Sequence, residues 1–491
     1  MKSRSSFLSF LFFPLFVALG FLVMGYHPGI EDDGVYLTAA KADLNPALYP
    51  HDADFFRLQM QASLFDNAMA ATVKLTGLRL PWVALLLQLL SITLILWACL
   101  GIARLLFAER AAQWGAVSMV AAMLTLPVAG TALFIADQHL HPRNLATALI
   151  LIAVWRILDG RYWLAVPLLL LSCVLHPIMA ALGISFCLFT AMVHLQPKPA
   201  WQESVRESLA AALPLGWIFE SPNSSWRHAL DAKSALLLDR WTWYEWLGAI
   251  APLFLFWLLW RLAGRNGKTP LSRLALAVFA YGVFQQIVAL GMLGPSALIR
   301  LAPLQPMRYL QLVYIFMALV GGGLIGRFFL KEKAWRWALY LILFNGGMFG
   351  VQRAMYASSP HIELPGMAAS NDWMEAFTWI RQNTPVDAYF ALDPNYLAAP
   401  GEDFHSFRAL AERSQLADAN KDCAVVTVVP QLGPEWERQL RAQDGWEHFQ
   451  IADFQRLKSS FGVDWVLLLR PQAAGLECPW HNRTLAVCRI P

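Results

Sequence analysis

Three consecutive carboxylates, Glu31, Asp32 and Asp33, stand directly behind the first long apolar segment of the sequence, in the stretch HPGIEDDGVYL. A carboxylate can deprotonate an acceptor hydroxyl, or hold a divalent cation that neutralises a departing phosphate. A solvated loop explains the same residues without any chemistry. The choice between site and loop depends on which other groups the fold brings to the same place, and on which side of a membrane they lie.

A second polar group occurs in the stretch FIADQHLHPRNLA, which places Asp137, His139, His141 and Arg143 within seven residues. Carboxylate and imidazole groups at this density suit a divalent cation such as Mg²⁺ or Mn²⁺, and the planar donor fork of an arginine suits a phosphate. The spacing is not that of a zinc motif. We therefore expect either a cation site or a polar loop between two helices.

Four further residues are candidates for substrate binding. Arg300 and Arg308 lie ahead of an apolar segment, where they could meet a lipid phosphate. His176 ends another apolar segment beside Pro177, and an ionisable group at membrane depth is a functional candidate unless it only caps a helix broken by its proline. Glu245 lies in the run DRWTWYEWLG, which is typical of an interfacial aromatic belt with a solvated acid and could alternatively face a sugar or lipid.

The elements that must position these residues are membrane helices. Of the 491 residues, 57% are hydrophobic and 15% are charged, and the mean hydropathy is +0.45. A soluble protein of this size carries charge on about a quarter of its residues. The net charge of +4 is small, and the basic residues are scattered at the ends of apolar runs, which argues against a nucleic-acid partner. The composition predicts an integral membrane protein.

The first apolar segment, 1–27, has Lys2 and Arg4 ahead of about twenty apolar residues, which is enough for one membrane crossing. A cleaved signal peptide is the alternative, although the run is long for a signal and no small-x-small cleavage site precedes His27. If the segment is retained, the amino terminus is cytoplasmic and the three acids emerge on the outer side.

Further apolar segments predict about eleven crossings in total. They lie at 82–103, 112–134, 144–158, 162–176, 178–194, 246–262, 271–293, 309–329 and 335–352. Basic residues in alternate turns, such as Arg104, Arg156 and Arg327, favour a cytoplasmic location for those turns. The alternation requires one short or re-entrant crossing at 205–220. The carboxyl-terminal region then lies on the outer side with the acids, at the periplasmic face of a bacterial inner membrane.

The sequence predicts a membrane domain at 1–358, with a long outer loop at 27–81, and a soluble α/β domain at 359–491. The outer loop carries apolar residues at mixed helical spacing, as in an interfacial helix or in a helix packed on its neighbours. In the soluble part, strand-like runs at 388–392, 423–429 and 465–469 alternate with helical patterns. One helical pattern begins with Asp372 and Glu375, which resemble a capping box, and has an apolar face of Trp373, Phe377 and Ile380.

The six cysteines divide into two groups. Three lie in apolar runs, where a thiol behaves as a small hydrophobe: Cys99, Cys173 and Cys187. Cys478 and Cys488 flank a turn-rich stretch that a hairpin disulfide could close in an oxidising compartment. Since Cys423 remains, any two of these last three cysteines could pair.

At this level the chain resembles the GT-C superfamily of membrane glycosyltransferases. The shared layout is an acidic motif after the first helix, here Glu31-Asp32-Asp33, a second acidic position between the third and fourth helices, here Asp137, and an outer soluble domain. The stretches HPRN at 141–144, LHP at 175–177, WTWYEWLG at 241–248 and WIRQNTP at 379–385 are similar to those of uncharacterised bacterial membrane proteins with this layout. Two features depart from the pattern: the second loop has one acid with two histidines, and the tryptophan-tryptophan-aspartate signature of oligosaccharyltransferases is absent from the sequence.

The resemblance implies a transferase that takes a sugar from a polyprenyl-phosphate carrier and passes it to a glycan, lipid or protein acceptor. It implies that Asp32 or Asp33, beside Glu31, is the base or the carboxylate that orients the acceptor. Asp137 with His139 or His141 would bind Mg²⁺ or Mn²⁺, or the acceptor. The lipid phosphate would be bound by Arg143, Arg300 and Arg308. A transporter or lipid-handling protein could line a pathway with the same residues, although the sequence shows no internal repeat. A non-catalytic assembly factor is the third hypothesis.

Overall fold

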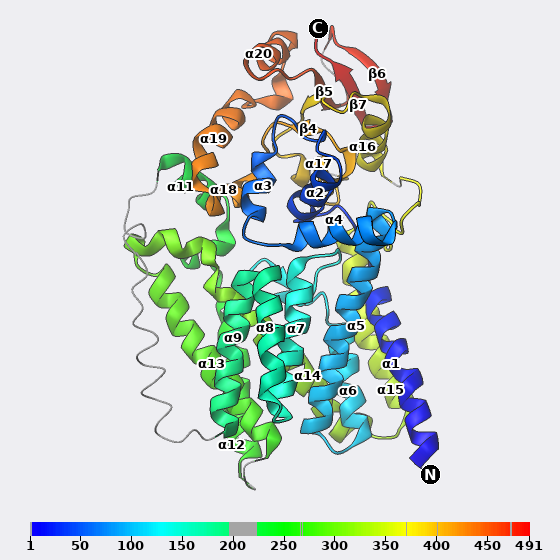
Figure 1. The fold of residues 1–491 in the computed structure, drawn as a ribbon, viewed down its shortest axis with the longest axis vertical. Coiled ribbons are helices and arrows are strands. Elements are labelled where there is room, and N and C mark those ends of the chain that lie inside the picture. The colour runs from blue at the N-terminus through cyan, green and yellow to red at the C-terminus, as the bar shows by residue number, and fades with distance from the viewer. Residues whose placement is uncertain are drawn as a thin grey trace.

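The structure is a computed structural model of the chain and describes residues 2–195, 223–265, 267, 269–369, 371–399, 401–471 and 474–491. It has two parts, a bundle of long helices and a layer of shorter elements over one end of that bundle (Figure 1), which we call the bundle and the outer layer. The amino terminus lies at the far end of the bundle and the carboxyl terminus lies in the outer layer. The two termini are therefore at opposite ends of the molecule.

Long apolar helices form the bundle. They are α1 (Lys2–Met24), α5 (Leu80–Leu106), α6 (Arg110–Ala122), α7 (Pro142–Leu158), α8 (Tyr162–Leu175), α9 (Pro177–Leu195), α12 (Trp243–Ala263), α13 (Pro270–Leu293), α14 (Leu310–Ile325) and α15 (Ala334–Met355). Aliphatic side chains of α5, α6, α7 and α14 fill the centre. The Pro at the start of α5, α7 and α13 costs nothing, because the first turn of a helix has no use for that amide hydrogen.

Five of the described helical segments are long and apolar enough to cross a membrane, judged by length and composition: Leu80–Leu106, Pro177–His194, Trp243–Ala263, Pro270–Leu293 and Pro306–Leu330. They support an integral membrane protein. The count of about eleven crossings stays a prediction, and the crossing expected at 205–220 lies outside the described residues.

The apolar segment expected at 112–134 is not one continuous helix. Helix α6 ends at Ala122, and β1 (Pro127–Val128) pairs with β2 (Leu133–Phe134) in a small antiparallel hairpin. Pro127 has no amide hydrogen to continue a helix. Gly130 turns the hairpin at φ +64°, and a Cβ there would lie 2.5 Å from the ring of Trp241. The 13 residues of α6 rise only about 20 Å, less than the roughly 30 Å core of a bilayer.

The outer layer combines three helices from the first outer loop, one from a later loop, and the carboxyl-terminal region. Its helices are α2 (Asp33–Leu44), α3 (Asp54–Met60), α4 (Phe65–Thr76), α11 (Ser224–Asp231), α16 (Asp372–Asn383), α17 (Phe407–Ala411), α18 (Asp422–Val428), α19 (Gly433–Ala442) and α20 (Ile451–Phe461). Its strands are β3 (Tyr389–Ala391), β4 (Ser414–Gln415), β5 (Trp465–Leu469), β6 (Glu477–His481) and β7 (Leu485–Arg489). They form one sheet in the order β4-β3-β5-β7-β6, parallel between β4, β3 and β5 and antiparallel from β5 onward.

The predicted small α/β domain is therefore present, with two local corrections. The run 423–429, expected as a strand, is helix α18. Side-chain Oδ1 of Asp418 accepts hydrogen bonds from the amides of Asn420 and Lys421 in the turn ahead of this helix. The tertiary context thus overrides the strand preference of its valines. Helix α16 is capped by Asn371, whose side chain accepts from the Met374 amide at 2.8 Å, and not by the predicted Asp372. The predicted apolar face of α16 is buried.

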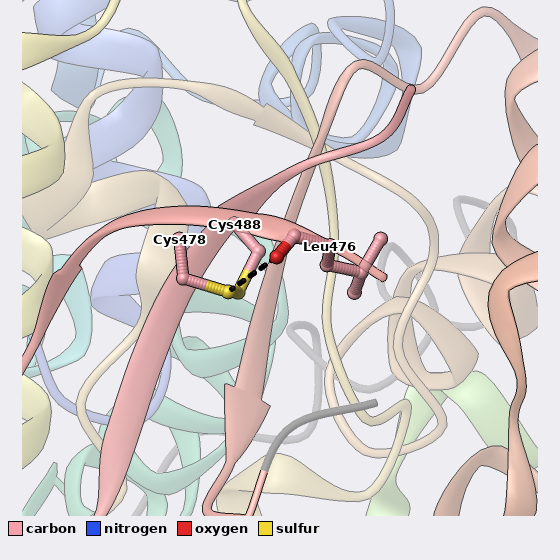
Figure 2. The surroundings of a disulfide bond; sticks show 3 residues. All are labelled: Leu476, Cys478 and Cys488. Atoms are coloured by element: carbon pink, nitrogen blue, oxygen red, sulfur yellow. Dashed lines mark hydrogen bonds between the residues drawn. A yellow bond between two sulfur atoms is a disulfide. The ribbon is translucent and has the colours of Figure 1, made fainter. Parts of the chain in front are cut away.

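A disulfide joins Cys478 on β6 to Cys488 on β7, with Cα atoms 3.9 Å apart (Figure 2). This settles the choice among the three carboxyl-terminal cysteines. Cys423 is buried, and its thiol donates to the carbonyl of Asn420 at 3.2 Å. Of the pairings that the sequence leaves open, the structure has the one that flanks the turn-rich stretch.

The first outer loop and the carboxyl-terminal region share one hydrophobic core. Phe55 and Phe56 of α3 belong to the same buried cluster as Val425 and Trp436 of the carboxyl-terminal region. Helix α4 packs against α2 and α5, so of the two alternatives for this loop the structure shows packing on neighbouring helices. The predicted loop 27–81 is thus a folded part of the outer layer.

A buried ion network joins the same two parts. Arg408 donates through Nε to Asp52 Oδ2 at 2.5 Å, and through Nη1 and Nη2 to the two oxygens of Asp422 at 2.7 and 3.0 Å. All three side chains are less than 5% exposed. Removing one member leaves an uncompensated buried charge, which costs far more than losing an exposed pair.

We predict that Arg408→Met lowers the free energy of unfolding by about 3–5 kcal/mol, because Asp52 and Asp422 lose their shared counter-ion. Arg441→Met is the matched control, since Arg441 pairs with Glu437 on α19 but its side chain is 73% exposed; its cost should stay below about 1 kcal/mol. Chemical denaturation in detergent measures both. Equal costs for the two variants would contradict the assignment of Arg408 as the link between the parts.

Candidate functional site

The backbone that carries the three acids is held from one side by the segment after the last bundle helix. The amide of Tyr26 donates to the His361 carbonyl at 3.1 Å, and the amide of Glu363 donates to the Tyr26 carbonyl at 2.8 Å. The next amide, that of His27, donates to the carbonyl of Gln138 at 2.9 Å. The residues ahead of the acidic motif are therefore bonded to the 361–363 segment and to the loop that contains Gln138.

From the other side, a carboxyl-terminal segment pairs with the same stretch. The amide of Glu31 donates to the Phe404 carbonyl at 3.0 Å, and the amide of Ser406 donates to the Gly29 carbonyl at 2.7 Å. Glu31 and Phe404 both have left-handed backbones, at φ +49° and +65°, a conformation that costs a non-glycine residue energy. The surrounding pairing holds this strained geometry at the acidic motif.

A buried histidine and glutamate cluster ties these segments together. Glu363 accepts from His27 Nδ1 at 2.7 Å and lies 3.2 Å from His405 Nε2. The other ring nitrogen of His405 lies 3.5 Å from Glu402. Burial opposes charge on His405, but its bonds to Glu363 and Glu402 raise the pKa of His405 to about 10. The imidazolium form is therefore part of the folded structure at neutral pH, and we call these four residues the clasp.

Asp32 is the acid that faces both the bundle and open space. Its Oδ2 lies 3.2 Å from His141 Nε2, and its Oδ1 lies 3.4 Å from Lys421 Nζ. Lys421 also bonds Glu31. The side chains of Glu31 and Asp32 are 40% and 41% exposed. Burial would raise the pKa of Asp32, but Lys421, the hydrogen bond from His141 and the charge of Arg143 hold that pKa well below its usual value, so Asp32 is ionised.

His141 has a defined tautomer. Its Nδ1 accepts a hydrogen bond from the Arg143 amide at 2.9 Å, in the capping position of α7. The proton of a neutral ring must then be on Nε2, from which it is donated to Asp32. Burial and the charge of Arg143 lower the pKa of His141 to about 4. The ring therefore stays neutral and orients Asp32 as a hydrogen-bond donor.

Asp33 differs from Asp32 in its exposure and in its hydrogen-bond partner. It is 4% exposed and accepts a hydrogen bond from the Gly29 amide at 2.7 Å, which closes the turn ahead of α2. Burial raises the pKa of Asp33 to about 6, and the neighbouring charge of Asp32 adds to that shift, against opposing effects of His139 and the Gly29 amide. Asp33 therefore has a structural role in the turn, whereas the side chain of Asp32 stays partly open to solvent.

Asp137 and Arg143 form a buried two-point ion pair. Nη2 of Arg143 donates to Oδ1 at 2.6 Å and Nε donates to Oδ2 at 3.2 Å. The backbone of Asp137 is held in turn by Gln88 and Asn144. Although burial would raise it, the pKa of Asp137 is lowered, chiefly by the charge of Arg143. This carboxylate neutralises an arginine that helps to orient the site.

As arranged, the predicted cation ligands do not fit a divalent cation. Both oxygens of Asp137 are taken by Arg143, and both nitrogens of His141 are taken by Arg143 and Asp32. The ring of His139 lies 5.9 Å from that of His141, measured between centroids. Within the described ranges, no group of three or more His, Cys, Asp or Glu side chains is placed to hold a metal ion.

Two more predicted residues lie near this cluster. The ring of His176 is 6.0 Å from that of His141, and its Nδ1 accepts from the Met179 amide at 3.3 Å, so His176 both caps α9 and lines the site. Arg308 lies in a 3₁₀ turn ahead of α14, within electrostatic range of Asp32 and Arg143. Its Nε has no hydrogen-bond partner among the described residues.

Two other predicted residues lie on other elements. Glu245 closes a capping box at the start of α12, where it accepts from the Thr242 amide at 2.7 Å, and so has the solvated, local role. Arg300 is partly buried in the 3₁₀ turn Ser296–Leu304.

Two residues of the site were missed in the sequence. Tyr36 packs its ring edge-on against His141, 4.7 Å between centroids. Its position one helical turn after Asp32 was a usable signal, because residues four apart share one face of a helix. Lys421 had no such signal, since 389 residues separate it from Asp32.

Comparisons with known proteins give two similarities. Residues 371–442 match a family model described as a domain of unknown function (DUF6798), and this segment contains both Arg408 and Lys421. Among solved structures, the chain is similar to the apo crystal structure of the Archaeoglobus fulgidus oligosaccharyltransferase, with 10% sequence identity, 93% of this chain and 69% of that chain covered, and a TM-score of 0.42. A search of curated proteins gives no match.

We predict that Asp137→Asn lowers the free energy of unfolding by about 3–5 kcal/mol, because Arg143 is left buried without a counter-ion. Added Mg²⁺ or Mn²⁺ should not change this cost. The control is Asp159→Asn, which removes the carboxylate 3.2 Å from the largely exposed Arg161 and should cost less than about 1 kcal/mol. A cation-dependent cost at Asp137 would show instead that this carboxylate is a metal ligand.

The clasp predicts a pH dependence of stability. An unfolded histidine has a pKa near 6.5, so between about pH 6.5 and 10 the folded chain binds one more proton at His405 than the unfolded chain. Stability should therefore fall as the pH rises through this window, with a slope of up to about 1.4 kcal/mol per pH unit. His405→Gln should flatten the curve of thermal midpoint against pH. Parallel curves for the two proteins would sink the assignment.

Proposed function

We propose that this protein is a membrane glycosyltransferase that takes a sugar from a polyprenyl-phosphate carrier and transfers it to a glycan, lipid or protein acceptor. The observation that carries the proposal is the convergence of Asp32, His141, Arg143 and Arg308 at one end of an apolar bundle, under a folded outer layer. Such an arrangement offers a carboxylate to an acceptor and guanidinium groups to a lipid phosphate.

In this proposal Asp32 is the carboxylate that contacts the acceptor. It is ionised, half-exposed and oriented by the Nε2 hydrogen of His141. It accepts the proton of the acceptor hydroxyl as the acceptor oxygen bonds the anomeric carbon of the sugar and the bond from that carbon to the carrier phosphate breaks, which releases the polyprenyl phosphate. Asp33 supports this geometry from within the turn, and Glu31 shares the ammonium of Lys421 with Asp32.

Arg308 is the proposed contact for the carrier phosphate. It begins the apolar segment Pro306–Leu330, so a lipid lying beside that helix would bring its phosphate to the same end of the bundle. An arginine with an unpartnered buried Nε is suited to an anion, because a guanidinium binds phosphate oxygens in pairs. Arg143 adds positive charge beside it, while Asp137 keeps Arg143 in place. No step is assigned to a divalent cation.

The proposal places the outer layer in the periplasm of a bacterium and the amino terminus in the cytoplasm. The Cys478–Cys488 disulfide fits an oxidising compartment. The two termini lie at opposite ends of the long axis, as a chain with its ends on opposite sides of a membrane requires.

One observation favours a second candidate function, the handling of a lipid without sugar transfer. A groove of about 570 Å³ runs between α1 and α15 and is lined by Leu19, Val23, Phe349 and His361. Apolar walls of this size suit an acyl or prenyl chain. In that case the acids would line a headgroup site and no bond would be broken.

We predict that the purified protein in nanodiscs binds polyprenyl-phosphate sugars and transfers or hydrolyses the sugar, and that Asp32→Asn lowers the turnover by roughly 10²–10⁴-fold. The fold should survive, since an amide oxygen can still accept from His141. The control is Asp453→Asn, which changes a partly exposed carboxylate in the capping box of α20 and should keep wild-type turnover.

Binding without turnover across the panel of carrier sugars would favour lipid handling. Wild-type turnover in Asp32→Asn would remove the proposed role of this carboxylate. If the protein shows no binding and no turnover, the assembly-factor hypothesis remains.

A further inference from the structure

An ammonium group lies between the two exposed carboxylates of the acidic motif. Nζ of Lys421 bonds Glu31 Oε2 and lies 3.4 Å from Asp32 Oδ1. The lysine side chain is only 17% exposed, while both carboxylates are near 40%. The positive charge thus approaches the acids from the protein interior and leaves their outer edges open.

Hydrogen bonds at Lys421 and at the next residue fix the backbone that carries this ammonium. Its amide donates to Asp418 Oδ1, and the next residue, Asp422, has both oxygens on Arg408. Arg408 in turn bonds Asp52 of the first outer loop. The network of Arg408, Asp52 and Asp422 therefore positions the ammonium of Lys421. The same network anchors the first outer loop, which contains Glu31 and Asp32, the acids that the ammonium contacts.

We propose that Lys421 supplies, from within the chain, the positive charge that a divalent cation would otherwise supply to Glu31 and Asp32. Two observations support this. The two carboxylates already share one cation, and the third nearby acid, Asp137, is bonded at both of its oxygens by Arg143. A divalent cation at the same oxygens would lie beside the ammonium and be repelled by it.

This assignment gives the matched segment 371–442 a specific part in the site: its lysine positions the acids. For catalysis, a consequence that rests on the proposed function, Lys421 is a positioning residue that keeps Asp32 ionised and aimed. The outer layer and the bundle would then form one site, in which the acids come from the first outer loop and their counter-ion comes from the carboxyl-terminal region.

The test compares cation binding in the full-length wild type and in Lys421→Met, by thermal midpoint with and without MnCl₂ and by Mn²⁺ electron paramagnetic resonance. We expect no Mn²⁺-dependent stabilisation in the wild type. Lys421→Met should have a lower midpoint without metal and should recover several degrees with Mn²⁺, with at least tenfold tighter Mn²⁺ binding, because two carboxylates lose their ammonium. Lys421→Arg keeps the charge and should behave as wild type.

Lys458→Met is the matched control, because Lys458 donates to the carbonyl of Ile490 and contacts no carboxylate in the described structure. It should gain no Mn²⁺ response. The inference is overturned if Lys421→Met gains none either, or if the wild type shows a Mn²⁺ response that Glu31→Gln/Asp32→Asn abolishes. None of these readouts uses turnover, so they are independent of whether the protein is a transferase.

A second measurement needs no lysine variant and covers the case in which Lys421→Met does not fold. Acetylation of Lys421 in the wild-type protein is followed by mass spectrometry in the presence and absence of Mn²⁺. An unchanged slow rate is expected, since the ammonium stays on its carboxylates. A rate that Mn²⁺ increases several-fold would mean that the metal displaces the lysine, which contradicts the proposal.

Discussion

The backbone pairing of residues 26–31 is the constraint on which the rest of the structure depends. This stretch leaves the first bundle helix and is held between the 361–363 segment and the 404–406 segment, which follow the last bundle helix. Because it is bonded on both sides, this stretch sets the position of the first outer loop against the carboxyl-terminal region. The strained backbones of Glu31 and Phe404 persist only inside such a frame. The acidic motif is thus presented by pairing between distant parts of the chain.

Two buried networks of charged side chains strengthen this pairing. Each joins residues at or near the first outer loop to the carboxyl-terminal region. The clasp joins His27 and Glu363 of the bundle end to His405, and Arg408 joins Asp52 of the first loop to Asp422. Apolar contacts could hold the two parts together with less cost, since buried ions lose hydration. Directional bonds, however, define one relative position of the parts, and the site needs this: a shift of one ångström at Lys421 would separate it from Asp32.

Adjacent residues of one chemical type differ here in burial and in the groups that surround them. Asp32 is half-exposed and held ionised by cationic and hydrogen-bonding neighbours, whereas Asp33 is enclosed, binds a turn amide and has a pKa raised to about 6. In the same way Arg143 and Arg308 share one region, but Arg143 donates through Nε and Nη2 to Asp137, whereas Nε of Arg308 has no hydrogen-bond partner in the described structure. Residues of one type that look interchangeable in the sequence therefore differ in charge and in partners because their surroundings differ.

The sequence by itself determined the features that short-range patterns encode. Apolar length predicted most of the bundle helices, although not the end of α6 at Ala122. The spacing of Trp373, Phe377 and Ile380 predicted one buried face, and the turn-rich stretch between Cys478 and Cys488 predicted a hairpin. Only the tertiary structure decided that Asp422–Val428 is helix α18, that Asp137 pairs with Arg143, that Glu245 caps α12, and that Lys421 contacts the acidic motif. The physical reason is range: periodicity and turn chemistry act within a few residues, while an ion pair across 389 residues depends on how whole elements pack.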